Sequence, residues 1–303
     1  MPEPEASFCL KPGESLPQGF HRILAEQLNA AAALLSEPDG SLDKAVHESR
    51  KCLKRARSVL RLIRPAVPDA YSRENQRLGD IGRQLSALRD AQALIQTVED
   101  LGKDVKRDRG SSATLELLRS RKKEVLDALK SGGELESSVY QLRAAVKDIG
   151  KLSLRKVDLP VIVESVRTSV KRGRRAFAKA YSDPQAENFH ECRKRAKDMR
   201  YQTEVLTEFW PEVLEGYSDS AKELEQLLGE DHNLAVLAEI LEGQAPVSGK
   251  RPELQREIRK KQDKLRAKAR QLGARLYSEP AKAWTRRLES SWEVWRAMSP
   301  SQR

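Results

Sequence analysis

The feature that most constrains this chain is a basic helical motif that occurs twice. Residues 47–57 read HESRKCLKRAR and residues 190–200 read HECRKRAKDMR, so both copies follow the pattern HExRKxxKxxR. The two copies lie 143 positions apart. A repeat of this length is too long for a short-period solenoid and indicates two similar halves, each large enough to form a domain.

A second, unlike motif repeats at the same offset. The segment LSALRDAQAL, which contains Asp90, corresponds to LGEDHNLAVL, which contains Asn233. Two motifs rarely share one offset by chance, so the register supports an internal duplication. We expect an all-α fold of two domain-sized helical bundles related by a pseudo-twofold axis.

Apolar residues recur with the period of an α-helix along most of the chain, whereas strand-like alternation is nearly absent. Short segments rich in Pro, Gly, Asp and Ser separate the helical runs. A content of 39% hydrophobic and 33% charged residues suits long amphipathic helices. We predict a flexible N-terminal tail at residues 1–18, an N-terminal helical bundle at 19–150 and a C-terminal helical bundle at 151–303.

Each copy of the basic motif places its cations on one side of a helix. At 100° per residue the cationic positions of the first copy fall within about 120°, and the apolar positions occupy another sector. One face can therefore pack in a bundle while the other binds an anion. We call the cationic faces the two stripes; they consist of His47, Arg50, Lys51, Lys54, Arg57 and Arg61 in the first copy, and of His190, Arg193, Lys194, Lys197 and Arg200 in the second.

The positive charge of the chain is concentrated in and beside the stripes. Residues 47–64 carry a net charge of +6, residues 171–179 carry +5 and residues 190–201 carry +3, against +11 for the whole chain, so the remainder is −3. A solvated helix face usually intersperses both signs, but the first stripe contains no acid. The second stripe loses its charge at one end, where Glu204 aligns with Arg61. Two such faces would repel each other unless a polyanion neutralised them.

These segments resemble the CHAD family, the conserved-histidine α-helical domain. HESRKCLKRARSVLRLIRP is similar to the family's first histidine helix, KRGRRAFAKAYSDPQAENFHECRKRAKDMRY to its second, and LGARLYSEPAKAWTRRL to its C-terminal segment. The resemblance implies two four-helix bundles related by a pseudo-twofold axis, and non-enzymatic, cofactor-free binding of inorganic polyphosphate along a basic groove or channel between them. The sequence lacks the ExExK signature of the triphosphate-tunnel domain to which family members can be fused, so we expect a stand-alone module. Carried onto this sequence, the resemblance makes the residues of both stripes ligand-facing, together with Arg22, Arg172 and Arg175.

Other functions compete with polyphosphate binding. His47 and His190 could carry phosphoryl groups, although the sequence lacks a Gly-rich phosphate loop and an acidic Mg²⁺ cluster. The charge suits nucleic acid, but aromatic residues make up only 5% and none interleaves the first stripe, which argues against it. The stripes could also be the solvated faces of a scaffold.

The sequence also carries signals of location. Three cysteines without metal-ligand spacing indicate a reducing compartment. The N-terminal segment lacks the basic start and apolar run of a signal peptide, and no stretch approaches the length of a membrane span. We expect a cytoplasmic protein; association with polyphosphate granules is left open.

The remaining polar and aromatic candidates have structural interpretations. The four histidines form no HExxH or other paired ligand set, which argues against a metal site. We expect surface or capping roles for His21 and His232, core positions for Cys52 and Cys192, capping or bracing by Asp90 and Asn233, and packing by Trp284, Trp292 and Trp295.

Overall fold

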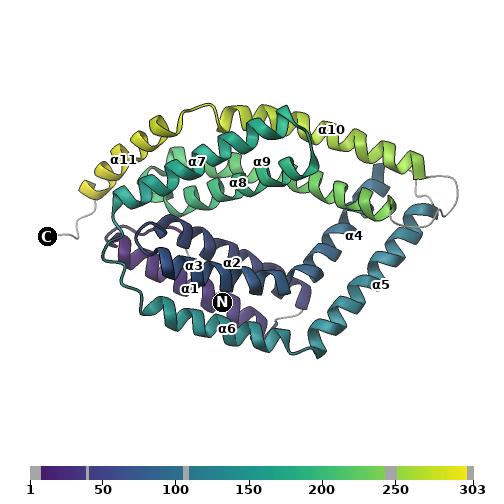
Figure 1. The fold of residues 1–303 in the computed structure, drawn as a ribbon, viewed down its shortest axis with the longest axis horizontal. Coiled ribbons are helices and arrows are strands. Elements are labelled where there is room, and N and C mark those ends of the chain that lie inside the picture. Colours follow the sequence, from purple (N-terminus) through teal and green to yellow (C-terminus); the bar gives the residue numbers. More distant parts are fainter. Residues whose placement is uncertain (1–7, 39–40, 105–108, 243–250, 299–303) are drawn as a thin grey trace.

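The computed structural model describes residues 8–38, 41–104, 109–242 and 251–298, and every regular element within these ranges is a helix. The predicted all-α class is therefore confirmed (Figure 1). The elements in chain order are α1 (Leu16–Ser36), α2 (Leu42–Ile63), α3 (Pro68–Gln84), α4 (Ser86–Asp104), α5 (Arg109–Ser131), α6 (Glu134–Gly150), α7 (Leu159–Ser182), α8 (Ala186–Val205), the 3-10 turn η1 (Thr207–Phe209), α9 (Pro211–Glu242), α10 (Arg251–Leu276) and α11 (Ala281–Met298).

Helix starts recur at the offset of the sequence repeat. α1 begins at Leu16 and α7 at Leu159, which are 143 positions apart. Both helices are capped alike: the side chains of Ser15 and Asp158 accept a hydrogen bond from the backbone N–H three residues on, and a proline follows in the first turn. Local capping chemistry thus sets the same helix start in both halves.

The two halves differ where α3 meets α4. Pro68 starts α3 and Pro211 starts α9, again at the common offset, but the first half breaks at Leu85 while α9 continues to Glu242. α4 and α5 extend away from the N-terminal bundle and reach toward α10 and the end of α9 (Figure 1). This divergence positions the candidate site between the two halves.

Two apolar cores hold the helices together. In the main core α1 packs on α2 and α6, which also contact α3, while α8 packs on α7 and α9, and α7 on α11. A second, smaller core joins α4 and α5 to α9 and α10, and so combines helices from both halves. Helical periodicity identifies a buried face but not the partner that covers it, so this second core was not predicted.

The expected N-terminal tail is too long. Phe8 and Leu10 are buried, and the N–H of Leu10 donates to the carbonyl of Val205 at 3.0 Å. The prolines and polar residues of this segment suggested a loose chain, but its few apolar side chains find sites in the main core. The ordered chain therefore begins well before residue 19.

Two glycines allow aromatic rings to pack against helix backbones. A Cβ on Gly173 of α7 would lie 2.5 Å from Cε1 of Tyr277, and a Cβ on Gly273 of α10 would overlap the ring of Phe177. The two rings lie against each other, with centroids 5.7 Å apart. Gly173, inside the KRGRR segment, is thus a packing residue among cations.

We predict that Gly173→Ala and Gly273→Ala each lower the free energy of unfolding by about 1–3 kcal/mol, because an added methyl overpacks the contact. Gly216→Ala on α9 is the control, since its Cβ would meet nothing within 4 Å. That change should raise the free energy of unfolding by up to about 1 kcal/mol through helix propensity. Urea unfolding measures the free energy of unfolding of the three variants. A change of the same sign in all three would contradict the packing argument.

Candidate functional site

The two stripes meet where α2 contacts α8. Lys54 and Lys197 are both partly buried, and Lys197 is the charge that acts most strongly on Lys54. Arg50 and Arg193 occupy equivalent positions in the repeat, and Arg89 and Asp90 act electrostatically on both of them. We keep the name basic groove, for the groove that the sequence predicts, for the region of Arg50, Lys54, Arg193 and Lys197.

Lys54 carries the least compensated charge of the basic groove. No carboxylate lies within ion-pair distance of its ammonium in the part of the chain that the structure describes. Burial, followed by the positive charges of Lys197 and Arg50, lowers the pKa of Lys54 to about 7. Burial also lowers the pKa of Lys197. A partly buried ammonium beside like charges is stabilised by an added anion.

Two guanidinium groups in the groove have donors that the protein does not use. The Nε–H groups of Arg50 and Arg193 are buried and have no hydrogen-bond partner among the described residues. Arg193 lies against Gly229, where a Cβ would come within 3.2 Å of its Nη2. Buried unsatisfied donors are costly, and both occur at the same position of the repeat.

The second stripe is partly neutralised by a carboxylate from α9. Glu225 lies 3.2 Å from Nζ of Lys197 and 3.1 Å from Nη1 of Arg200. Burial opposes ionisation of Glu225, but Lys197 and Arg200 outweigh it and hold the pKa of Glu225 below its ordinary value. In the first half the equivalent residue is Gly82, whose carbonyl oxygen accepts from Arg50. The first stripe thus lacks this internal anion.

Acids also bind the cations at the other end of the stripes. Arg61 of α2 forms an ion pair with Asp198 of α8, and Arg195 donates to the second oxygen of that carboxylate at 2.7 Å. Nε of Arg200 donates to Glu204 at 2.8 Å. Asp198 is only 10% exposed, so Arg61 braces α2 against α8.

Each stripe histidine has a partner at the equivalent position of the repeat. Nε of Arg89 donates to Nδ1 of His47 at 3.0 Å, and the ring of His232 lies over that of His190 with centroids 4.3 Å apart. The expected surface or capping role of His232 is therefore wrong. His232 aligns with Arg89 at the 143-residue offset, and this alignment is the sequence signal that could have predicted His232 as a site residue.

Both stripe histidines favour the neutral form in the absence of ligand. Burial, followed by the charges of His232 and Lys194, lowers the pKa of His190 to about 4. Burial, followed by Arg89, lowers the pKa of His47. An anion nearby would act in the opposite direction and favour protonation.

The remaining stripe residues lie at the edge of the groove. Lys51 pairs with Glu48 at 3.3 Å and Lys194 with Glu191 at 3.5 Å. Arg57 donates from Nε to Oδ1 of Asn75 at 3.0 Å. These weak or neutral partners can be exchanged for a ligand at little cost.

Three further predicted residues lie outside the groove. Arg172 and Arg175 on α7 line a shallow hollow of about 420 Å³, and Arg172 also lines a neighbouring one beside Arg61. They can extend the basic surface beyond the brace at Arg61. Arg22 on α1 is bound by ion pairs to Glu14 and Glu26.

One concentration of charge was missed by the count along the sequence. Residues 251–276, which form α10, contain ten Lys or Arg and three acids, a net charge of +7. Most of these cations are exposed, whereas Arg266 pairs with the buried Asp231 at 2.7 Å. The charge of the chain is thus divided between the groove region and the outer face of α10.

A known domain family and a solved structure are similar to this chain. A model of the CHAD domain family matches residues 22–242, more than two thirds of the chain. The chain belongs to the CHAD domain family. No curated protein matches it. Among solved structures, the crystal structure of the CHAD domain from the plant Ricinus communis is similar, with a TM-score of 0.57 over 97% of each chain and 16% sequence identity. At that identity the likeness shows the fold alone.

The CHAD domain bears out several structural predictions. Cys52 and Cys192 are buried, and Trp292 and Trp295 pack with Phe209. Nε2 of His21 binds the carbonyl of Leu152, just after α6.

Two kinds of feature are absent from the described ranges: a group of three or more His, Cys, Asp or Glu that could hold a metal ion, and a helix long and apolar enough to cross a membrane.

We predict that the stability of the CHAD domain depends on pH through His190. Its pKa of about 4 lies below the unfolded value of about 6.5, so the unfolded state binds more protons between these values. The free energy of unfolding should therefore fall as the pH is lowered from 7 to 4.5. His190→Asn should reduce this dependence, as measured by urea unfolding at several pH values. An identical dependence in the wild type and the variant would contradict the assignment.

Proposed function

We propose that this CHAD domain binds inorganic polyphosphate in the basic groove and does not catalyse its turnover. The observation that carries the proposal is Lys54, which faces Lys197 across the groove without an ion-pair partner among the described residues. Folding a chain into this arrangement costs stability unless an anion compensates for it. The family resemblance independently points to polyphosphate.

The spacing of the stripe residues suits a regular chain of phosphates. Successive cations on one face of a helix lie about one turn, or 5.4 Å, apart along the axis. Arg50 and Arg193 offer forked donors, including the buried Nε–H groups, while Lys54 and Lys197 act as point charges. A polyanion can therefore contact both halves at once.

The histidines suit binding better than group transfer. His47 contacts Arg89, and His190 contacts His232. Glu48 lies 3.8 Å from Nε2 of His47, which is too far for a hydrogen bond that would orient the ring as a base, and among the described residues no carboxylate pairs with His190. We therefore expect neither phosphohistidine nor release of phosphate after incubation with polyphosphate. Recovery of either product would favour the enzymatic alternative.

We predict that Lys54→Gln combined with Lys197→Gln weakens binding of long-chain polyphosphate by about 100-fold, since two charge-assisted contacts are lost. Calorimetric titration at two salt concentrations should also show a smaller salt dependence, by analogy with counter-ion release from nucleic acids. Lys151→Gln combined with Lys222→Gln removes two exposed lysines and is the matched control.

Unchanged affinity in the Lys54→Gln plus Lys197→Gln variant would exclude the groove as the binding site. RNA that displaces polyphosphate from the wild type at equal phosphate concentration would instead favour a nucleic-acid ligand. Absence of binding to either polymer at physiological salt would support a scaffold.

We predict that Glu225→Gln strengthens polyphosphate binding by about tenfold, because Lys197 and Arg200 then lose the carboxylate that competes with the ligand. Glu223→Gln removes the same charge from an exposed position on the same helix. It should change the affinity less than about twofold. Equal effects of the two substitutions would show that only net charge matters.

A further inference from the structure

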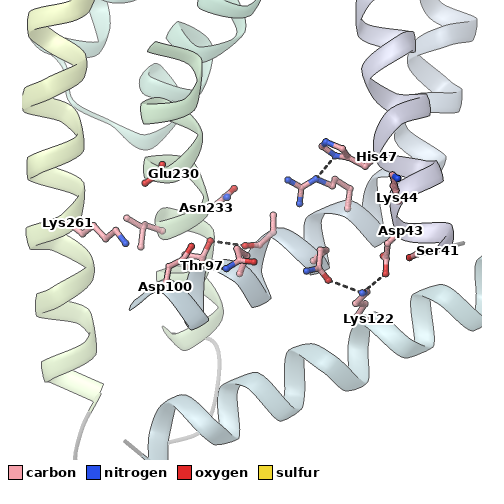
Figure 2. Close-up of a pocket in the computed structure, with 15 residues that line it drawn as sticks. Ser41, Asp43, Lys44, His47, Thr97, Asp100, Lys122, Glu230, Asn233 and Lys261 are labelled. Carbon is pink, nitrogen blue, oxygen red and sulfur yellow. Dashed lines mark hydrogen bonds and ion pairs between the residues drawn. The ribbon is translucent and has the colours of Figure 1, made fainter. Parts of the chain in front are cut away.

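A second compartment adjoins the basic groove. A cavity of about 700 Å³ lies between α2, α4, α5, α9 and α10 (Figure 2). This volume is typical of small-molecule sites. His47 and Arg89, which belong to the histidine pair of the first half, line the cavity. Arg89 acts electrostatically on Arg50 and Arg193, and Lys54 acts on His47, so the cavity lies beside the basic groove.

The cavity differs from the groove in charge. Its wall carries three carboxylates, from Asp43, Asp100 and Glu230, beside four cations, from Lys44, Arg89, Lys122 and Lys261. Lys122 is compensated by Asp43 at 2.5 Å (Figure 2). Lys122 also donates to Gln92 at 2.8 Å. Carboxylates beside cations compete with a phosphate for them. The cavity is therefore a weaker site than the groove for a continuation of the same polymer.

Neutral polar groups make up much of the remaining wall. Gln92, Gln96 and Asn233 present amides, and Thr97 presents a hydroxyl. Amides offer both donors and acceptors, which suits uncharged polar ligands such as sugars and nucleobases. The rim adds two planar groups, the ring of His47 and the guanidinium of Arg89, of the kinds on which nucleobases stack. His47 is half exposed, so its ring remains accessible.

We infer that the cavity receives the nucleoside of a nucleoside polyphosphate whose phosphate chain lies in the basic groove. The inference rests on the proposed function, because the same cations hold the phosphates. It adds a ligand class that the groove alone would not select. His47 and Arg89 lie at the junction, where the first phosphate meets the nucleoside.

The test compares adenosine 5′-tetraphosphate with inorganic tetraphosphate by calorimetry, in EDTA and at one ionic strength. The nucleotide carries less charge because one terminal phosphate is esterified, so charge alone would make it the weaker ligand. We expect it to bind roughly tenfold more tightly, through stacking and hydrogen bonds in the cavity.

Two cavity variants make the test specific. Gln96→Leu combined with Asn233→Leu removes polar groups, and Ala93→Trp fills the space; each should abolish the preference and leave tetraphosphate binding unchanged. Gln271→Leu, at an exposed position of α10 outside the cavity, should retain the preference. Equal affinities in the wild type, or a preference that survives both cavity variants, would overturn the inference while the proposed function stands. If neither tetraphosphate nor long-chain polyphosphate binds, both the inference and the proposed function are refuted.

Discussion

The juxtaposition of two like-charged helix faces is the constraint on which the rest of this structure depends. α2 and α8 each bury an apolar face in the main core, and this burial forces their cationic faces toward each other. Leu53, Leu60 and Ile63 are among the fully buried side chains of α2. Each contributes about 1.5–3 kcal/mol when buried, which is comparable to the cost of bringing a few cations together near solvent.

The molecule offsets this repulsion in part, and it does so unevenly. Asp198 joins Arg61 to Arg195 at one end of the stripes, and Glu225 binds Lys197 and Arg200. Both carboxylates belong to the second half of the chain. In the first half, Lys54 has no ion pair among the described residues. The two halves have similar helices, but the first half would gain more from a bound anion.

The sequence predicted the helices and the cationic faces because both follow from local periodicity. The common offset of 143 residues also aligns Arg89 with His232. In the structure Arg89 contacts His47 and His232 contacts His190, so the aligned residues have the same neighbour in both halves. What could not be predicted were contacts between distant helices. The position of Glu225 against the second stripe and the core shared by α4 and α10 depend on how helices cross, which periodicity does not encode.

The central claim is that Lys54 costs stability in the ligand-free protein and is maintained for binding. The most direct test is the free energy of unfolding of the wild type and of the Lys54→Gln variant, each with and without long-chain polyphosphate. We expect the ligand-free variant to be the more stable protein by about 1 kcal/mol, and polyphosphate to stabilise the wild type more than the variant. A variant that is less stable without ligand, or that polyphosphate stabilises equally, would contradict this account.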